Sequence, residues 1–258
     1  MSAMEFGRFP VLLRRELAKG VIELWITCPN AVNAAPGQFV GILCEGMPLR
    51  RPLSICRTDE RNHAFCVVFE VRGAGTQWLA ARGKGELLDV LGPLGSGFDL
   101  SGCESKSAVF VGGGIGAPPL LAAAQRFGSR ADVLLGFRTA ASVILLRDFA
   151  GTGAHVFIAT DDGSAGHRGL VTELLGARLD RAPCDIVYAC GPKPMLSAAA
   201  EIAAAHGVRC QVSLEERMAC GVGACLCCAS KIRDASGGEH YRHVCKDGPV
   251  FEADQVVF

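Results

Sequence analysis

The chain has 258 residues, enough for two domains or for one large and two small ones. Half of its residues are hydrophobic and 32 are glycines, a globular composition that excludes a disordered chain. Lys plus Arg and Asp plus Glu both number 26, and this zero net charge gives no support for binding to nucleic acid or to a membrane surface.

The first hundred residues predict a small antiparallel β-barrel. Short apolar or alternating runs recur there, and turn residues separate them, as at 33–37 and 92–97. Closely spaced strands of this kind are typical of a barrel. The strands that we expect cover residues 11–14, 21–27, 38–44, 65–71 and 86–91.

The middle of the chain alternates strand-like and helix-like runs, which implies a parallel, doubly wound sheet. The uncharged stretch 107–125 has the length of a membrane-spanning helix, but its internal glycines and prolines favour a strand, a loop and a helix start. We therefore expect no membrane segment. The expected strands are 108–111, 131–137, 155–160, 185–190 and 208–212, and the expected helices are 120–127, 170–179 and 194–206.

A glycine-rich run after the first of these strands predicts a site for a dinucleotide. Glycines let the chain turn and let a phosphate approach the start of the next helix. The acid that usually closes the second strand of a Rossmann fold is absent, because that strand ends Gly136-Phe137-Arg138. A later strand ends at Cys190, also at the ligand-binding edge of such a sheet, although a plain turn before a helix explains that run as well. The candidate nucleotide residues are Gly112, Gly113, Gly114, Ile115, Gly116, Cys190, Gly191 and Pro192.

Two short runs in the barrel carry groups that suit a phosphate. Arg51 offers a bidentate donor, and Ser54 offers a hydroxyl for a ring nitrogen. Residues 73–76 follow an expected strand and could present backbone amides to a pyrophosphate. Each run alone is equally compatible with an ordinary turn.

The chain has thirteen cysteines, and its N-terminal sequence lacks the apolar core and cleavage site of a signal peptide. We therefore expect a cytoplasmic protein whose cysteines serve metals or redox chemistry more often than disulfides. Four of them have the spacing C-x4-C-x2-C-x16-C, which is that of plant-type [2Fe–2S] ligands. A zinc site and a thiol pair remain alternatives, although structural zinc usually has two C-x2-C-like knuckles. The candidate metal ligands are Cys220, Cys225, Cys228 and Cys245.

The segment that carries these four cysteines is too short to fold on core burial alone, so a metal centre could supply the missing stabilisation. Gly221 and Gly223 would let the loop wrap closely, with amides free to point at the sulfurs. Cys227 lies between two proposed ligands and should point away. The other cysteines lie singly in apolar runs, where buried core thiols are expected.

Taken together, the motifs resemble those of the ferredoxin–NADP reductase superfamily, in which a flavin barrel with RxxS precedes a nucleotide domain with GGGIGxxP and CGPxPM. Residues 213–228 and 244–251 narrow the resemblance to the electron-transfer subunits of NAD-dependent dihydroorotate dehydrogenase B. The resemblance covers essentially the whole chain. It implies an FAD-binding β-barrel over 1–101, an NAD-binding α/β domain over 102–212 and a small [2Fe–2S] domain over 213–258.

The resemblance implies FAD, a [2Fe–2S] cluster and NAD as cofactors, and no catalytic acid or base in this chain. Cys190 would be a positioning residue near the nicotinamide. Leu53 stands where many relatives have an aromatic residue that stacks on the flavin. The residues that would contact FAD are Arg51, Pro52, Leu53, Ser54, Val68, Phe69, Glu70, Gly75 and Thr76.

The resemblance also implies a partner. Dihydroorotate would be oxidised on a separate FMN-containing catalytic subunit, and electrons would reach NAD⁺ through the cluster and FAD, in pyrimidine biosynthesis. The implied assembly is a heterotetramer with two copies of each subunit. One alternative is a related subunit that serves NAD(P)H and a ferredoxin or a sulfide-linked flavoprotein. Another is a non-catalytic redox or iron sensor, against which the complete set of flavin and nucleotide motifs argues.

Overall fold

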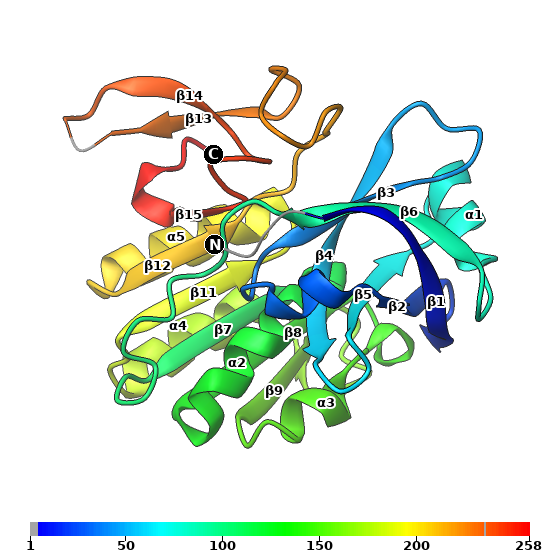
Figure 1. The fold of residues 1–258 in the computed structure, drawn as a ribbon. Helices are drawn as coiled ribbons and strands as arrows, with labels where there is room; N and C mark the ends of the chain where they lie inside the picture. The colour runs from blue at the N-terminus through cyan, green and yellow to red at the C-terminus, as the bar shows by residue number, and fades with distance from the viewer. Residues whose placement is uncertain (1–4, 235) are drawn as a thin grey trace.

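The computed structural model describes residues 5–234 and 236–258, which form a barrel, a sheet covered by helices, and a small C-terminal part (Figure 1). The barrel is closed and has six strands, the large sheet has seven, and a separate hairpin has two. The expected antiparallel barrel followed by a doubly wound sheet is confirmed. Among the residues described, no helix has the length and apolar character needed to span a membrane.

The barrel closes in the order β1-β2-β5-β4-β3-β6, with every pair antiparallel. Alternate side chains point inward and fill it with apolar groups such as Ile22, Leu24 and Ile26. Helix α1 (Ala74–Ala80) follows the fifth strand. The strands are β1 (Glu5–Ala18), β2 (Val21–Thr27), β3 (Phe39–Leu43), β4 (Arg50–Asp59), β5 (Ala64–Glu70) and β6 (Leu87–Leu94).

Strand β4 was not among the predicted strands. Its sequence contains several charged residues and a proline. Its only buried residues are the consecutive Ile55 and Cys56, and a bulge interrupts the pairing with β5 just after Ile55. The alternation that marks a strand is therefore lost. Strand β6 also runs further than expected, through Gly92 and Pro93, which the sequence placed in a turn.

The large sheet has the order β10-β9-β8-β7-β11-β12-β15, and all its pairs are parallel except the last. The chain runs outward from β7 to β10 and then returns to β11, so the strand order reverses between β7 and β11. The strands are β7 (Ala108–Gly113), β8 (Ala131–Phe137), β9 (His155–Thr160), β10 (His167–Arg168), β11 (Ile186–Cys190), β12 (Arg209–Ser213) and β15 (Val250–Glu252).

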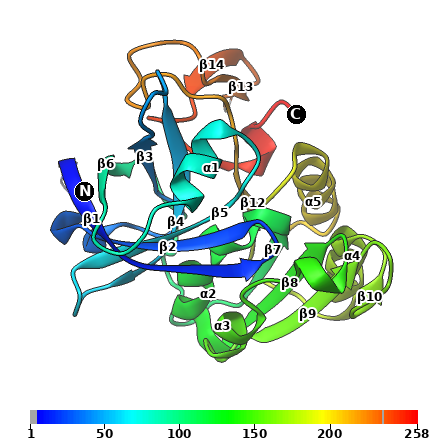
Figure 2. The same ribbon diagram turned by 90° about the vertical axis from the view of Figure 1, so that its right-hand side faces the viewer.

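Helices cover both faces of this sheet (Figure 2). On one face, Phe110 and Tyr188 stack with ring centroids 5.0 Å apart and pack under α2 (Leu121–Phe127) and α3 (Leu146–Ala150). On the other, Val109 and Val187 pack under α4 (Val171–Arg181) and α5 (Lys193–Ala205). Burial on both faces explains why these strands are continuous apolar runs in the sequence.

The C-terminal part contains the hairpin of β13 (Ala229–Arg233) and β14 (Glu239–His243), and then β15. Strand β15 pairs antiparallel with β12 and so completes the large sheet. None of these three strands was predicted. The domain boundaries drawn from the sequence stay predictions, and the one at 212/213 separates β15 from the sheet to which it belongs.

The barrel packs on the sheet through β4 and β5. Cys56 and Cys66 share a buried apolar cluster with Ala117 and Leu120, which follow the glycine-rich loop of the sheet. Beside this cluster, Arg57 pairs with the fully buried Glu23 of the barrel at 2.7 Å and with Asp148 of α3. The barrel wall and the glycine-rich loop are therefore in direct contact.

A substitution at Gly116 tests how closely the two backbones pack at the edge of this sheet. A Cβ atom there would lie 2.3 Å from the carbonyl oxygen of Cys190, whereas one on Gly176 of α4 would meet nothing within 4 Å. We expect Gly116→Ala to destabilise the protein by about 1–3 kcal/mol through overpacking. Gly176→Ala, the matched control, should stabilise it by about 0.5–1 kcal/mol. Urea unfolding measures both, and equal stability of the two variants would contradict the tight contact.

Candidate functional site

The two loops expected to bind a nucleotide meet at the carboxyl edge of the sheet. Gly112 of β7 is paired with Cys190 of β11. A Cβ on Gly113 would lie 2.6 Å from the sulfur of Met195, and one on Gly116 would collide with the backbone of Cys190. The structure thus brings Gly112–Gly116 and Cys190–Pro192 together at the point where the strand order reverses, which is where open α/β sheets bind ligands.

The helix that the sequence predicted over 120–127 is present as α2, Leu121–Phe127. The approach to it differs from the expectation that its first amides would face a phosphate, because two short 3-10 turns, Gly114–Gly116 and Pro118–Leu120, lie between β7 and α2. Pro118 and Pro119 lack amide donors, so the helix begins only at Leu121.

The thiol of Cys190 is buried at this edge and hydrogen-bonded to Ser213, with Glu215 nearby. Burial raises the pKa of the Cys190 thiol to about 12, so the group is neutral and is no nucleophile at neutral pH. Sequence reasoning named neither Ser213 nor Glu215 as a site residue. Both follow from the fold, because β12 ends beside β11 at this edge.

On the barrel, Arg51 and Gly75 lie in contact. A Cβ on Gly75 would lie 2.3 Å from Nε of Arg51, so the guanidinium rests on the glycine backbone. Arg51 also donates from Nη1 to the carbonyl oxygen of Leu49 at 2.8 Å. Gly75 lies in the first turn of α1, whose amides have no carbonyl partners within the helix. A cation beside these amides is a cradle that fits the pyrophosphate of FAD.

The other predicted FAD residues on β4 and β5 differ in what they can offer. Pro52 is exposed, and Leu53 and Ser54 are partly buried, with Leu53 packed on the barrel core. Val68 lies in the apolar cluster between barrel and sheet, so its side chain faces the contact. Phe69 points into the barrel, which leaves only its backbone for a cofactor.

Two further predicted FAD residues are already engaged in local contacts. Glu70 is exposed and forms an ion pair with Arg72 at 2.7 Å. The hydroxyl of Thr76 accepts hydrogen bonds from the amides of Arg72 and Gly73, at 2.9 and 3.1 Å, and so caps the start of α1. Its amide, rather than its hydroxyl, is available to a phosphate.

The four C-terminal cysteines lie as two pairs. Cys220 lies beside Cys225, and Cys245 lies beside Cys228, with Cys220 also near Cys245. Across residues 5–234 and 236–258, no three His, Cys, Asp or Glu side chains are grouped as ligands of a single metal ion. The two-plus-two arrangement fits a [2Fe–2S] cluster, in which two irons share four thiolates.

Backbone amides point at the sulfurs from the glycine-containing loop. Hydrogen bonds from the amides of Val222, Cys225 and Ala224 lower the pKa of the Cys220 thiol to about 6. The amide of Gly223 donates to Sγ of Cys245 at 3.2 Å. The loop turns at φ values of +72° for Gly221 and +79° for Gly223, which favour glycine. Such donors stabilise the charged sulfurs of a metal-bound thiolate.

The loop is anchored on the barrel and open to solvent on its outer side. Cys228 and Cys245 share a buried cluster with Phe39 and Leu94 of the barrel. Cys227 is exposed, in keeping with the expectation that it points away from the ligands. The cysteines far from this loop are buried, except for the partly buried Cys184. The thiol pairs thus lie between the barrel end and the surface.

Adjacent arginines of β4 provide a test of the FAD cradle. Arg51→Lys loses the planar fork, and we expect FAD to bind roughly 10- to 100-fold more weakly because a charge-assisted hydrogen bond is worth about 1.5–3 kcal/mol. Arg50 pairs instead with Asp89 at 2.7 Å, so Arg50→Lys is the matched control and should keep wild-type affinity. Fluorescence titration of the flavin-free proteins with FAD measures this. Equal affinities for both variants would refute the cradle.

Two cysteines of the same loop, Cys225 and Cys227, provide a test of the cluster ligands with its own matched control. Cys225→Ser should lose the cluster and keep FAD, because an iron loses one of its thiolates. Cys227→Ser, two residues along the same loop, should keep both cofactors. Ultraviolet–visible and EPR spectra of the purified variants report the result. A rhombic [2Fe–2S] signal that persists in Cys225→Ser would show that Cys225 is no ligand.

Solved structures with this fold include flavin-dependent reductases. A chain of the NADH-dependent reduced ferredoxin-NADP oxidoreductase superposes with a TM-score of 0.86 at 30% identity, covering 96% of this chain and 89% of that one. The ferredoxin reductase of carbazole 1,9a-dioxygenase superposes with a TM-score of 0.66 at 22% identity, over 80% of this chain and 67% of that one, and shows the shared fold alone.

Sequence relatives are more specific. Residues 215–257 match the family model of the iron-sulfur cluster binding domain of dihydroorotate dehydrogenase B. The electron transfer subunit of dihydroorotate dehydrogenase B (NAD(+)) from Caldanaerobacter subterraneus subsp. tengcongensis is 41% identical over 96% of this chain and 97% of its own length. That from Bacillus cereus is 42% identical over 96% of each chain. The chain therefore belongs to the family of dihydroorotate dehydrogenase B electron-transfer subunits.

Proposed function

We propose that this chain carries electrons to NAD⁺ from a separate, FMN-containing subunit that oxidises dihydroorotate. This transfer would be a step of pyrimidine biosynthesis. The observation that carries the proposal is the presence in one chain of three candidate sites. These are the two thiol pairs, the Arg51–Gly75 cradle on the barrel and the glycine-lined edge of the sheet. Relatives that are 41–42% identical over nearly their whole length carry the corresponding name.

When bound, FAD would exchange electron pairs with the nicotinamide and single electrons with the [2Fe–2S] cluster. The residues of the chain supply binding and placement. Arg51 neutralises the phosphates of FAD, and Gly113 and Gly116 let the ends of β7 and β11 pack closely at the sheet edge where the nucleotide would bind. The neutral thiol of Cys190 positions the nicotinamide without exchanging a proton. No general base is needed, because dihydroorotate is oxidised elsewhere.

The partner subunit is expected at the outer side of the cluster loop. Leu226 is 74% exposed and Val222 is 42% exposed, both between the proposed ligands. A partner seated on the cluster loop would cover both of these apolar side chains. A catalytic subunit seated there would bring its FMN near the thiol pairs. We propose a heterotetramer of two copies of each subunit, located in the cytoplasm.

A second candidate function is exchange of electrons between NAD(P)H and a ferredoxin. The 30% identity with the NADH-dependent ferredoxin-NADP oxidoreductase favours it, over 96% of the chain. The higher identity of the dihydroorotate dehydrogenase B subunits argues for the first proposal. Identification of the flavoprotein that co-purifies with the chain from its native cell separates the two.

The activity itself gives the first test. The isolated chain, loaded with its cofactors, should be bleached by NADH but should leave dihydroorotate untouched. Co-expressed with an FMN-containing catalytic subunit, it should support dihydroorotate-dependent reduction of NAD⁺, followed at 340 nm. Absence of that activity in a stable, fully loaded complex would exclude the proposed role.

The partner face gives the second test. Leu226→Asp places a charge in the proposed interface, and we expect the complex to bind at least ~10-fold more weakly, because a buried unpaired charge is costly. Leu170, 59% exposed just before α4, offers the matched control Leu170→Asp. Size-exclusion chromatography and titration calorimetry measure assembly. If both variants assemble like the wild type, the face lies elsewhere.

A further inference from the structure

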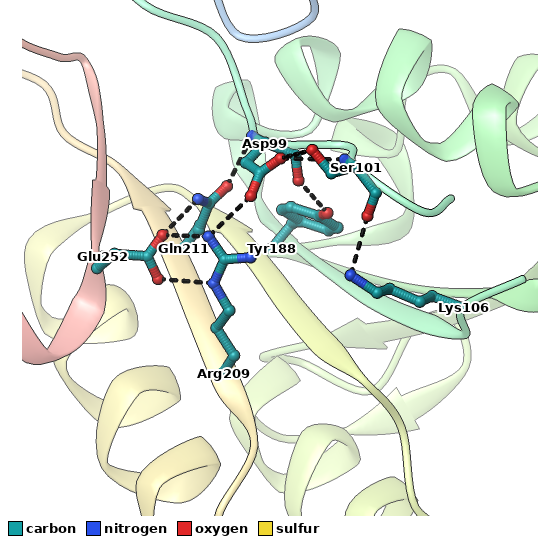
Figure 3. A network of polar contacts seen from close by, with 7 residues as sticks. All are labelled: Asp99, Ser101, Lys106, Tyr188, Arg209, Gln211 and Glu252. Carbon is teal, nitrogen blue, oxygen red and sulfur yellow. Dashed lines mark hydrogen bonds and ion pairs between the residues drawn. The ribbon is translucent and has the colours of Figure 1, made fainter. Parts of the chain in front are cut away.

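A network of polar side chains surrounds Glu252 of β15 (Figure 3). Glu252 ends the segment 244–252, which also contains the proposed ligand Cys245. Arg209 of β12 lies at the centre of the network. The guanidinium donates from Nε to Oε2 of Glu252 at 3.0 Å and from Nη2 to Oε1 of Glu252 at 2.6 Å. The same Nη2 lies 3.0 Å from Oδ2 of Asp99. One side chain therefore joins β12, β15 and the connection between barrel and sheet.

Asp99 is fixed from several sides at once. Its amide donates to Oε1 of the buried Gln211 at 3.0 Å, and its carbonyl oxygen accepts from the hydroxyl of Tyr188 at 2.7 Å. Its carboxylate accepts from the amide and hydroxyl of Ser101, which lower its pKa to about 2. Gln211 also donates to Glu252 at 2.6 Å. The two carboxylates around Arg209 are thus held in place from several sides.

The same connection holds the segment at a second point. The amide of Ser96 donates to the carbonyl oxygen of Gly248 at 2.6 Å, and its hydroxyl donates to that of Asp247 at 3.1 Å. Ser96 and Asp99 lie directly after β6, the last barrel strand. The segment that carries Cys245 is therefore tied at both Gly248 and Glu252 to residues 96–101, which lead out of the flavin barrel.

Val244, Cys245, Val250 and Phe251 of the segment are buried, whereas the side of the segment that carries Glu252 borders open space. A cavity of about 290 Å³ lies beside the network and is lined by Gly97, Asp99, Gln211, Arg242 and Glu252, among others. The Arg209 side chain is 43% exposed and that of Asp99 is 39% exposed, so their ion pair adds only about 0–1 kcal/mol to stability. A bidentate contact in such a place fixes geometry more than it stabilises the fold.

We propose that Arg209 is a positioning residue for electron transfer, because it fixes the Cys245 segment relative to the flavin barrel. The inference rests on the proposed function. Without the guanidinium, β15 keeps its backbone pairing with β12, and Glu252 stays linked to Asp99 only through Gln211. The end of the segment at Glu252 is then held less rigidly, so the position of Cys245 relative to the flavin barrel is less sharply fixed.

The test compares three variants of the full chain loaded with FAD and cluster. Arg209→Gln removes the fork, and Arg209→Lys keeps a charge that cannot bridge two carboxylates in the same geometry. Arg178→Gln is the matched control, because Arg178 pairs with Asp132 inside the nucleotide part and contacts no residue of the segment. Stopped-flow absorbance separates flavin bleaching by NADH from the later reduction of the cluster. Hydrogen exchange follows the amides of peptides covering 93–98 and 244–252.

In Arg209→Gln we expect flavin bleaching within about 2-fold of the wild type and cluster reduction slowed by clearly more than that margin, because electron transfer slows as the two centres move apart. Exchange in both peptides should become faster. Arg209→Lys should lie between, and Arg178→Gln should match the wild type.

The inference would be overturned if Arg209→Gln left the rate of cluster reduction or the rate of amide hydrogen exchange unchanged. It would also be overturned if Arg178→Gln changed both rates as much as Arg209→Gln does. Failure of NADH to bleach the wild-type flavin is a different result. It would count against the proposed function, whereas the exchange measurement would still decide whether Arg209 holds the segment.

Discussion

The backbone of Gly116 touches the backbone of Cys190 at the carboxyl edge of the sheet, and the rest of the site is built around that contact. A side chain at residue 116 would have no room. The close approach brings the ends of β7 and β11 together where the strand order reverses. It also sets the path of Ala117 and Leu120, which form the surface on which the barrel rests. The nucleotide edge and the flavin barrel are thus neighbours because two stretches of backbone meet.

Most of the cysteines outside the proposed ligand set fill buried contacts in this arrangement. Cys56 and Cys66 lie in the buried contact between barrel and sheet, and Cys190 lies at the nucleotide edge. A thiol is small, apolar and a weak donor, so it fills a close-packed contact without demanding a strong partner. Burial raises the pKa of the thiols of Cys66 and Cys190, which keeps them protonated and unreactive.

The sequence predicted those parts of the fold whose signals are local. Strands β7, β8 and β11 are buried on both faces and therefore appear as apolar runs, and the cluster ligands were proposed from their spacing in one short segment. Strand β4 was not predicted, because its bulge and its charged residues interrupt the alternation of apolar and polar side chains that marks a strand. The roles of Ser213 and Arg209 depend on partners that are distant in sequence, such as Glu252, which lies 43 residues after Arg209. Only the folded chain brings such residues together.

Strand β15 lies late in the chain, so the edge of the large sheet can be completed only late in synthesis. Until residues 250–252 leave the ribosome, β12 is an open edge strand of the large sheet, with unpaired backbone groups. The same short stretch trails Cys245, so the last cysteine is delivered to the other three as the sheet closes. A truncated chain would lack both the closing strand and a fixed fourth thiol. Closure of this sheet edge and the position of the proposed ligand Cys245 therefore depend on the same stretch, residues 245–252.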